Sequence, residues 1–501
     1  MNPNTDNPIN NSNNNNNIDQ AALNAYVQKR LLEEKNKRNS HTETRMHTLE
    51  IIGNLMLLLV TGLFIISPFL QLIIRAINRI GRKSISTRAE YQNLYQWMIK
   101  NINYTTRFTT VLILILLIIY VTICKRTKTA DKTTNNKSRT NTDKNIIKNI
   151  CSNINKFLPM FIFLLFVLSI ILVTIIRTPN EYDLTGHPYM FESIYSYISY
   201  PLVYFFCGML LFKENYRKFL LYALVFTAMP INILSLINEW CTKIKLFNDE
   251  GVCAVFHNSN HYGYYLTLTI ITSALLFVYE KKIALKIFFA ISGIIGTIVL
   301  VINNTLGAYL AVLFVLILFI IYSLFIAKEH RLLSAILLLS FLFITFVMNF
   351  KYSTILSSFV TLSSDVSMII EDPSKADSAG SSRWRLWKGT VIHLKDSPFL
   401  GFGVEGLLNT YRIGTPHNEF LQYAEFFGIQ TSLLYFVACV IVLIRILINI
   451  KKVDKTTIIC FFVCIGYLAS SFFGVAIYYT TPFIYIFLGI GYGGYLNKIL
   501  D

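Results

Sequence analysis

Long apolar segments separated by short polar turns dominate this sequence of 501 residues. Runs such as 107–124, 155–176 and 305–327 contain almost no charged residue. An apolar helix of about 20 residues crosses the roughly 30 Å hydrocarbon core of a bilayer, and a helix satisfies its backbone hydrogen bonds internally. The pattern therefore predicts an all-α integral membrane protein.

About twelve segments fit this description of a transmembrane helix. They are 49–74, 107–124, 155–176, 193–212, 218–238, 261–279, 283–302, 305–327, 332–350, 429–450, 457–474 and 481–497. The spans divide the chain into four predicted parts: a disordered Asn-rich cytoplasmic tail at 1–48, transmembrane helices 1–9 at 49–350, a large external loop at 351–428, and transmembrane helices 10–12 at 429–501.

Basic residues in the turns predict the orientation. Segment 125–156 holds nine Lys and Arg against two Asp, and such an excess marks a short cytoplasmic loop. If the spans alternate, the basic turns near 213–218, 281–286, 328–331 and 451–455 lie on the same side. We therefore expect a multi-pass protein of the cytoplasmic (inner) membrane, with both termini cytoplasmic and 351–428 external. Segment 75–106 departs from this pattern, because it is basic yet falls outside.

The net charge of +17 and the eight cysteines add two points. The basic residues mark the orientation of the spans, so we expect no nucleic-acid partner. Most cysteines lie in or beside apolar runs, and no Cys/His spacing suggests zinc. Cys241 and Cys253 share a predicted external loop, where a disulfide could persist, and the sequence leaves that pairing open.

Residues 380–428 gather the groups that could perform chemistry. A predicted basic aromatic helix comes first, in which Arg383 and Trp387 share a face. The turn around Gly401 and Gly403 follows, where glycine lets the backbone approach a ligand closely. The remaining basic residues of this segment that we expect near a substrate are Arg385, Lys388 and Arg412.

A second helix is predicted to begin at Thr415-Pro416, because Thr favours the cap position and Pro the first turn. This start places His417 in the first turn, where the helix dipole favours anions. An apolar stripe along this helix would face the membrane surface or the bundle; it consists of Phe420, Leu421, Ala424 and Phe427.

Arginine forks that grip phosphate oxygens, next to a histidine that can accept a proton, suit one reaction. A hydroxyl attacks a sugar whose leaving group is a pyrophosphate, and the arginines stabilise the departing charge in place of a metal. A simpler interpretation remains open, in which Arg383 and Arg385 bind lipid headgroups and His417 caps its helix.

The same segment resembles the signature of the O-antigen ligase and polymerase family of bacterial surface-polysaccharide enzymes. The matching positions are Arg383, Trp387, Pro398, Gly401, Gly403, His417, Asn418, Leu421 and Gly428. Asn258-Ser259-Asn260-His261 also resembles a family feature, although a polar helix start explains it equally well. One position departs from the family, because Leu306 stands where members often have a second Arg. Arg385, Lys388 or Arg412 could supply that charge.

The resemblance implies a membrane-embedded glycosyltransferase of the GT-C type that uses no cofactor and no metal. Its donor would be an undecaprenyl-pyrophosphate-linked glycan in the membrane lipid, and its acceptor a glycan or another cell-envelope component. The family roles carry over as pyrophosphate binding for Arg383 and acceptor activation for His417, with Trp387, Gly401, Gly403 and Asn418 among the substrate contacts. Whether the protein is a ligase or a polymerase stays open.

Three other functions fit parts of the sequence. A metal-dependent glycosyltransferase would use Glu181-Tyr182-Asp183, a short acidic motif after the third span. A transporter or flippase of lipid-linked glycans would need charges within the membrane, and the predicted spans hold almost none. A structural or receptor role is the third alternative.

Overall fold

The computed structural model is helical wherever regular structure is described, and the described residues include no strand. The description covers 142–186, 192–210, 214–241, 252–256, 258–352, 354–372, 376–478 and 480–500, with scattered positions between 26 and 122. The basic segment 75–106 and most of the predicted tail 1–48 lie outside it, and the first two predicted spans are covered only in part.

The chain divides into two compact units. One contains residues 1–55 and 116–139, and the other contains residues 56–115 and 140–501. All the features discussed below belong to the second unit.

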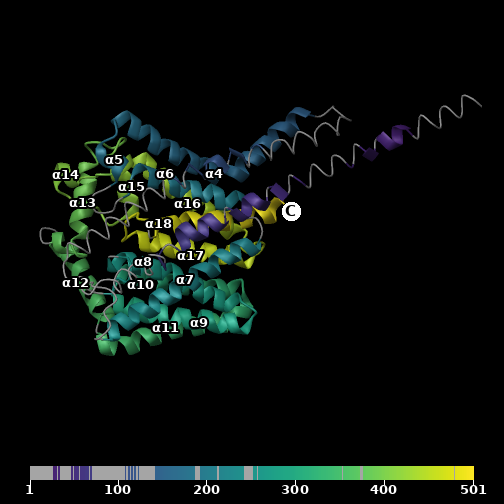
Figure 1. Cartoon of the computed structure of the whole chain (residues 1–501). Helices are drawn as coiled ribbons and strands as arrows, with labels where there is room; N and C mark the ends of the chain where they lie inside the picture. Colours follow the sequence, from purple (N-terminus) through teal and green to yellow (C-terminus); the bar gives the residue numbers. More distant parts are fainter. Residues whose placement is uncertain are drawn as a thin grey trace, which may run out of the picture. The chain divides into compact units, whose positions relative to one another are not determined.

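Long helices account for most of this unit (Figure 1). They are α4 (Thr142–Arg177), α6 (Ile194–Leu210), α7 (Glu214–Trp240), α8 (Ser259–Tyr279), α9 (Ile283–Asn303), α10 (Leu306–Phe325), α11 (Arg331–Tyr352), α16 (Ile429–Ile448), α17 (Lys455–Ser471) and α18 (Thr481–Leu500). Each predicted span from 155–176 onward coincides with one of these helices. Seven helices of the described part are long and apolar enough to cross a membrane, by length and composition.

The predicted external loop 351–428 is largely helical. It contains α12 (Ile355–Glu371), the 3-10 turn η3 (Ala376–Ser378), α13 (Arg383–His393), α14 (Leu408–Tyr411) and α15 (Glu419–Phe427). Figure 1 shows α12, α13 and α14 at one end of the helix bundle, together with the short α5 (Glu181–Thr185). The remaining short elements are the π-helical turn η1 (Thr61–Ile65) and the 3-10 turn η2 (Lys328–His330).

Burial separates the interior helices from the peripheral ones. In the most apolar 18-residue stretch of α8, 89% is buried, whereas in the corresponding stretch that includes α11 the buried share is 17%. Small residues bring α6 and α18 together, since a Cβ added to Gly489 would come within 2.6 Å of the Tyr204 carbonyl oxygen. Close approach of backbones at glycine is a common way for membrane helices to pack.

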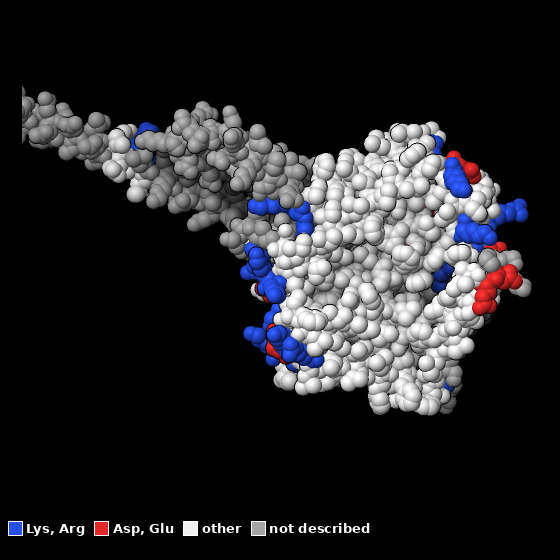
Figure 2. Space-filling view, turned by 180° about the vertical axis from the view of Figure 1, so that it is seen from behind, with Lys and Arg blue, Asp and Glu red and all other residues white. Residues whose placement is uncertain are grey.

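Charged side chains are concentrated at the two ends of the bundle. Figure 2 shows Lys and Arg at opposite edges, with an almost uncharged belt between them. At one end, Lys218 Nζ lies 3.1 Å from Glu280 Oε2. Close to the same turn, buried Arg217 pairs with Asp454 at 2.8 Å and fastens the start of α7 to that of α17. An apolar belt between charged ends is the expected surface of a protein that spans a bilayer.

The cysteine pair left open by the sequence is not bridged. Cys241 is exposed at the end of α7, Cys253 is buried, and no disulfide joins them. Burial of the other described cysteines agrees with their role as small apolar residues.

Candidate active site

Arg383 opens α13 and reaches the start of α8. Its Nη2 lies 3.4 Å from the Asn260 side-chain oxygen, and its Nη1 donates to the Gly380 carbonyl oxygen at 3.4 Å. Asn258 caps α8 by accepting a hydrogen bond from the Asn260 backbone N–H at 2.8 Å. The polar segment that the sequence singled out ahead of the sixth span thus meets the arginine of the motif.

His417 lies one residue before a helix cap, not in the first turn as the sequence suggested. The cap is Asn418, whose side chain accepts from the Leu421 backbone N–H at 3.0 Å, and α15 begins at Glu419. The prediction was wrong because Thr415 and Asn418 are both good cap residues, and Asn418 takes the position. His417 itself has a φ of 50°, a left-handed conformation that few residues other than glycine adopt.

Trp387 connects α13 to the His417 segment. Its indole Nε1 donates to the Pro416 carbonyl oxygen at 2.7 Å. Its ring centroid lies 6.4 Å from that of Phe472 and 6.2 Å from that of Phe473, just after α17. Asn418 binds the same stretch, because its Nδ2 donates to the Phe472 carbonyl oxygen at 3.1 Å.

Burial and the charge of Arg383 both act on the protonation of His417. Burial is the main cause that lowers the pKa of His417 from 6.5 to about 4, and the positive charge of Arg383 lowers it further. The imidazole is therefore neutral at pH 7 and has a lone pair available to accept a proton. Arg383 and His417, which lie 34 positions apart, thus share one electrostatic environment.

The other basic residues expected at the site are exposed. Arg385, Lys388 and Arg412 all face solvent, and Lys388 Nζ lies 3.8 Å from Asp377 Oδ1. Leu306, at the position where family members often have Arg, is the first residue of α10. The cap of that helix, Thr305, donates to the Ser259 carbonyl oxygen at 3.1 Å, so the starts of α8 and α10 adjoin.

An apolar groove runs beside the motif, between α13, α15 and α16. Its larger part has a volume of about 630 Å³ and adjoins a smaller part of about 370 Å³. Trp387, Lys388 and Asn418, which the sequence placed near a substrate, line the larger part. Other lining residues are Trp384, Val391, Phe420, Leu421, Ser432, Leu433, Phe436 and Phe472. The stripe predicted on α15 therefore faces this groove at Phe420 and Leu421.

The glycine turn packs against the end of α15. The backbone N–H groups of Phe402 and Gly403 donate to the carbonyl oxygens of Glu425 and Phe426, at 2.7 and 3.0 Å. Gly401 has a φ of +61°, and a Cβ added there would meet the Phe426 carbonyl carbon at 2.6 Å. These contacts explain both glycines through packing alone, without a ligand.

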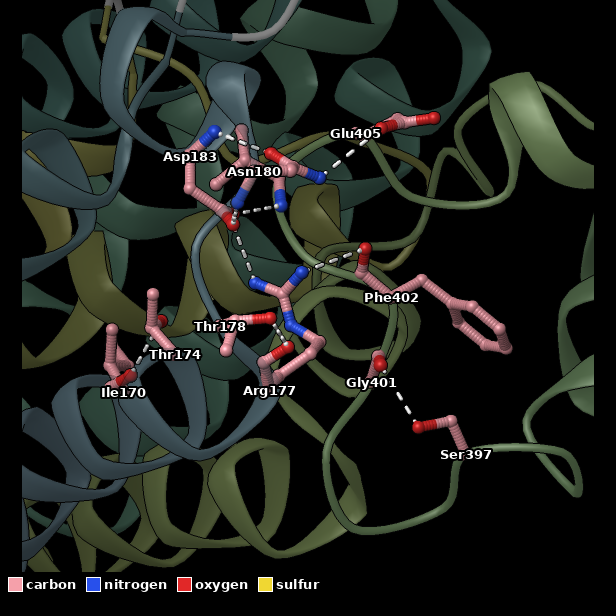
Figure 3. Close-up of polar contacts among 11 residues, drawn as sticks. Ile170, Thr174, Arg177, Thr178, Asn180, Asp183, Ser397, Gly401, Phe402 and Glu405 are labelled. Atoms are coloured by element: carbon pink, nitrogen blue, oxygen red, sulfur yellow. Dashed lines mark hydrogen bonds and ion pairs between the residues drawn. The ribbon is translucent and has the colours of Figure 1, made fainter.

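Arg177, the last residue of α4, holds the other side of this turn (Figure 3). Its Nη1 donates to the Phe402 carbonyl oxygen at 3.3 Å, and its Nη2 pairs with Asp183 Oδ2 at 2.8 Å. A Cβ at Gly403 would lie 2.2 Å from Arg177 Nη1, so the guanidinium occupies the space that a side chain would fill. The turn is thus fixed between α4 and α15.

Asp183 serves the fold with both carboxylate oxygens, as the dashed lines of Figure 3 show in part. Its Oδ1 accepts from the Val404 backbone N–H at 2.9 Å. Its Oδ2 accepts from the Asn180 backbone N–H at 2.9 Å, besides the pair with Arg177. Because Asp183 is 0% exposed and fully engaged, this acidic motif does not support the metal-dependent alternative.

Residues 287–436 match the sequence model of the family described as O-antigen ligase. The match confirms the resemblance to the O-antigen ligase and polymerase family, and it includes Arg383 and His417. A comparison with curated proteins found no match. The apolar helices and the match to the O-antigen ligase family together indicate a multi-pass membrane enzyme that transfers glycans. The family implies, in general terms, a lipid-linked glycan and an acceptor as partners.

Sequence reasoning missed two residues that shape this site. Arg177 ends an apolar run, where a basic residue normally indicates only orientation. Glu419 follows His417 by two positions, yet it is fully buried. The signal that could have revealed Glu419 is a charged residue on the apolar side of a short helix, since such residues are rarely buried without partners.

Proposed function

We propose that the protein transfers or polymerises an undecaprenyl-pyrophosphate-linked glycan at the outer face of the cytoplasmic membrane. The observation that carries the proposal is the hydrogen bond from Trp387, one helical turn after Arg383, to the carbonyl oxygen of Pro416, the residue before His417, at 2.7 Å. The positive charge of Arg383 also contributes to the lowered pKa of His417, after burial. The O-antigen ligase match over the same segment supports the proposal.

The reaction is a displacement at the anomeric carbon of the donor sugar. The acceptor hydroxyl oxygen forms the new glycosidic bond, the carbon–oxygen bond to the pyrophosphate breaks, and its electron pair leaves with undecaprenyl pyrophosphate. His417 receives the hydroxyl proton, and Arg383 stabilises the diphosphate through charge-assisted hydrogen bonds. No general acid is needed for this step, because the pyrophosphate leaves as a stable anion, and in this proposal arginine stabilises its charge in place of a metal.

Donor binding would make His417 a stronger base. The positive charge of Arg383 lowers the pKa of His417 in the free protein. A bound diphosphate adds negative charge next to Arg383, so the pKa of the imidazole rises. The base therefore gains strength only when the leaving group is in place, which disfavours proton uptake in the empty site.

The groove beside the motif suits the lipid part of the donor. Its walls are mainly apolar and aromatic, and Lys388 and Lys395 lie among the lining residues. An isoprenoid chain would enter the groove from lipid rather than from water, so close packing against the apolar walls, not the hydrophobic effect, would hold it there. A chain in the groove would lie beside Asn418 and Trp384, the sequence neighbours of His417 and Arg383.

Transfer by the purified protein in detergent tests the proposal, with a defined lipid-linked oligosaccharide and candidate acceptors. We expect His417→Asn to lower kcat at least about 100-fold, since general-base catalysis contributes about that much or more. Asn suits the left-handed backbone at this position, so the fold should persist. Chain lengthening would identify a polymerase, and transfer to a foreign acceptor a ligase. Full activity of the Asn variant would contradict the proposal.

The same assay separates the alternatives. A metal-dependent enzyme loses activity when a chelator is added, whereas we expect the rate to stay unchanged. A flippase reconstituted in vesicles moves the lipid-linked glycan across the bilayer without forming a glycosidic bond.

A further inference from the structure

The buried face of α15 carries a carboxyl group that the mechanism above does not use. Glu419 is 0% exposed and lies two residues after His417. Its Oε1 accepts from the Tyr435 hydroxyl of α16 at 3.0 Å, and its Oε2 accepts from the Tyr467 hydroxyl of α17 at 2.7 Å. Tyr467 in turn lies 3.0 Å from Thr481 Oγ1 in α18. The first turn of α15 is thus joined to three long helices.

The backbone of His417 needs such support. A φ of 50° is unfavourable for a residue with a Cβ, and such conformations persist only where the surroundings impose them. The contacts on both sides of His417 do this: Pro416 accepts from Trp387, and Asn418 donates to Phe472. Glu419 adds the deepest of these attachments, because it reaches the interior of the bundle.

We propose that Glu419 is a positioning residue that holds His417 in its half-buried place beside Arg383 without touching substrate. A buried carboxyl group is costly unless it is hydrogen-bonded, and both of its oxygens are. Several titratable groups surround the carboxyl: Tyr435 and Cys439 of α16, Tyr467 of α17, Tyr485 of α18, Tyr197 of α6 and Tyr423 of α15.

The inference deepens the proposed function, on which its kinetic part rests, but its main test needs no activity. In Glu419→Ala, both tyrosine hydroxyls lose their bond to α15, Tyr467 keeps Thr481 as an acceptor, and the first turn of α15 loosens. His417 then becomes more hydrated, so its pKa rises from about 4 toward 6.5. The pH dependence of diethyl pyrocarbonate modification, followed by mass spectrometry of the His417 peptide, measures this pKa in the full-length protein. We expect a rise of about one pH unit or more.

Glu419→Gln distinguishes positioning from proton transfer. The amide oxygen can accept from Tyr435, and the amide N–H can donate to the Tyr467 oxygen, whose hydroxyl can then donate to Thr481. We therefore expect Gln to restore the His417 pKa and most of the activity, whereas Ala lowers kcat about tenfold with little change in KM. A residue that exchanges protons with substrate would not be rescued by Gln, so an inactive Gln variant would overturn the positioning role.

Glu425 provides the matched control, because it is the other buried carboxyl of α15 and lies at the far end of the helix. Its Oε1 accepts from the Leu407 backbone N–H at 2.7 Å. Glu425→Ala should destabilise the protein yet leave the modification profile of His417 unchanged. An equal shift in this variant would contradict a specific role for Glu419.

A second variant covers the case in which Glu419→Ala fails to fold. Tyr467→Phe removes one of the two donors, and we expect a smaller rise in the pKa of His417. If the pH profile of His417 modification in both Tyr467→Phe and Glu419→Ala matches that of the unaltered protein, the inference is refuted. This holds even if transfer activity is present. Conversely, shifted profiles in a protein that transfers no glycan would uphold the positioning role and reject the proposed function.

Discussion

Trp387 donates its indole N–H to the Pro416 carbonyl oxygen at 2.7 Å, which holds α13 against the residue directly before His417. The two halves of the proposed chemistry lie on separate segments that such contacts bring together. Arg383 belongs to α13, whereas His417 belongs to the approach to α15. Breaking this hydrogen bond would leave the Pro416 carbonyl oxygen unsatisfied, which costs roughly 1–3 kcal/mol of stability.

The first prediction concerns this bond. Trp387→Phe keeps an aromatic ring against Phe472 but removes the donor, so α13 should move relative to His417. We expect kcat to fall about tenfold, because small displacements of catalytic groups reduce rates strongly. Steady-state kinetics and thermal unfolding in detergent measure the two effects.

Trp240→Phe is the control for that variant. Trp240 also donates its indole N–H, in this case to the Tyr352 hydroxyl at 2.6 Å, but it lies at the end of α7. Its replacement should alter stability without lowering kcat. If both variants lose activity equally, the connection between α13 and His417 has no specific role.

The second prediction is that kcat/KM and kcat lose activity at different acidic pH values. kcat/KM reports the free enzyme, in which the pKa of His417 is about 4. A base works when it is deprotonated, so kcat/KM should fall only as the pH drops toward 4. The acid limb of kcat reports the donor complex, and it should lie at higher pH because the bound diphosphate raises the pKa.

Arg383→Gln tests the cause of this difference. Loss of a neighbouring positive charge stabilises the protonated imidazole, so the pKa of His417 should rise and the limb of kcat/KM should move to higher pH. An unmoved limb in this variant would show that burial alone sets the pKa.

The third prediction concerns Gly403. Its φ is +83°, and an added Cβ would lie 2.2 Å from Arg177 Nη1. Gly403→Ala should lower the free energy of unfolding by roughly 1–3 kcal/mol, from backbone strain and the displaced guanidinium. Gly414→Ala is the matched control, since the nearest atom to a Cβ there, Leu386 Cδ2, is 4.0 Å away. Equal stability of the two variants in thermal unfolding would refute the packing account of the turn.

The long helices were predictable because apolar length is a local property of the sequence. All predicted spans from 155–176 onward correspond to helices. α12 was predicted as loop because Ser363 and Ser367 interrupt its apolar residues, which leaves a segment too polar to cross a membrane. The chain nevertheless forms a helix there, beside the ends of the long ones.

The residues of the candidate site were predictable from the sequence, but the contacts that hold them in place were not. Arg383, Trp387 and His417 carry residue types whose chemistry can be recognised from the sequence. The role of Arg177 depends on the Phe402 carbonyl oxygen, which lies 225 positions away along the chain. The exact start of α15 depended on a choice between two adequate cap residues, which the Asn418 contacts with Leu421 and Phe472 decide.

The contact between Arg383 and Asn260 has a consequence for how the protein can be divided. The family match covers 287–436, whereas Asn260 precedes it and Tyr467 follows it. The recognisable segment is therefore not a self-sufficient module. A chimera that exchanges only 287–436 with a relative would contain the motif, but the residues that contact it would come from the other protein. A transfer of activity therefore requires that α8, α17 and the end of α4 are exchanged as well.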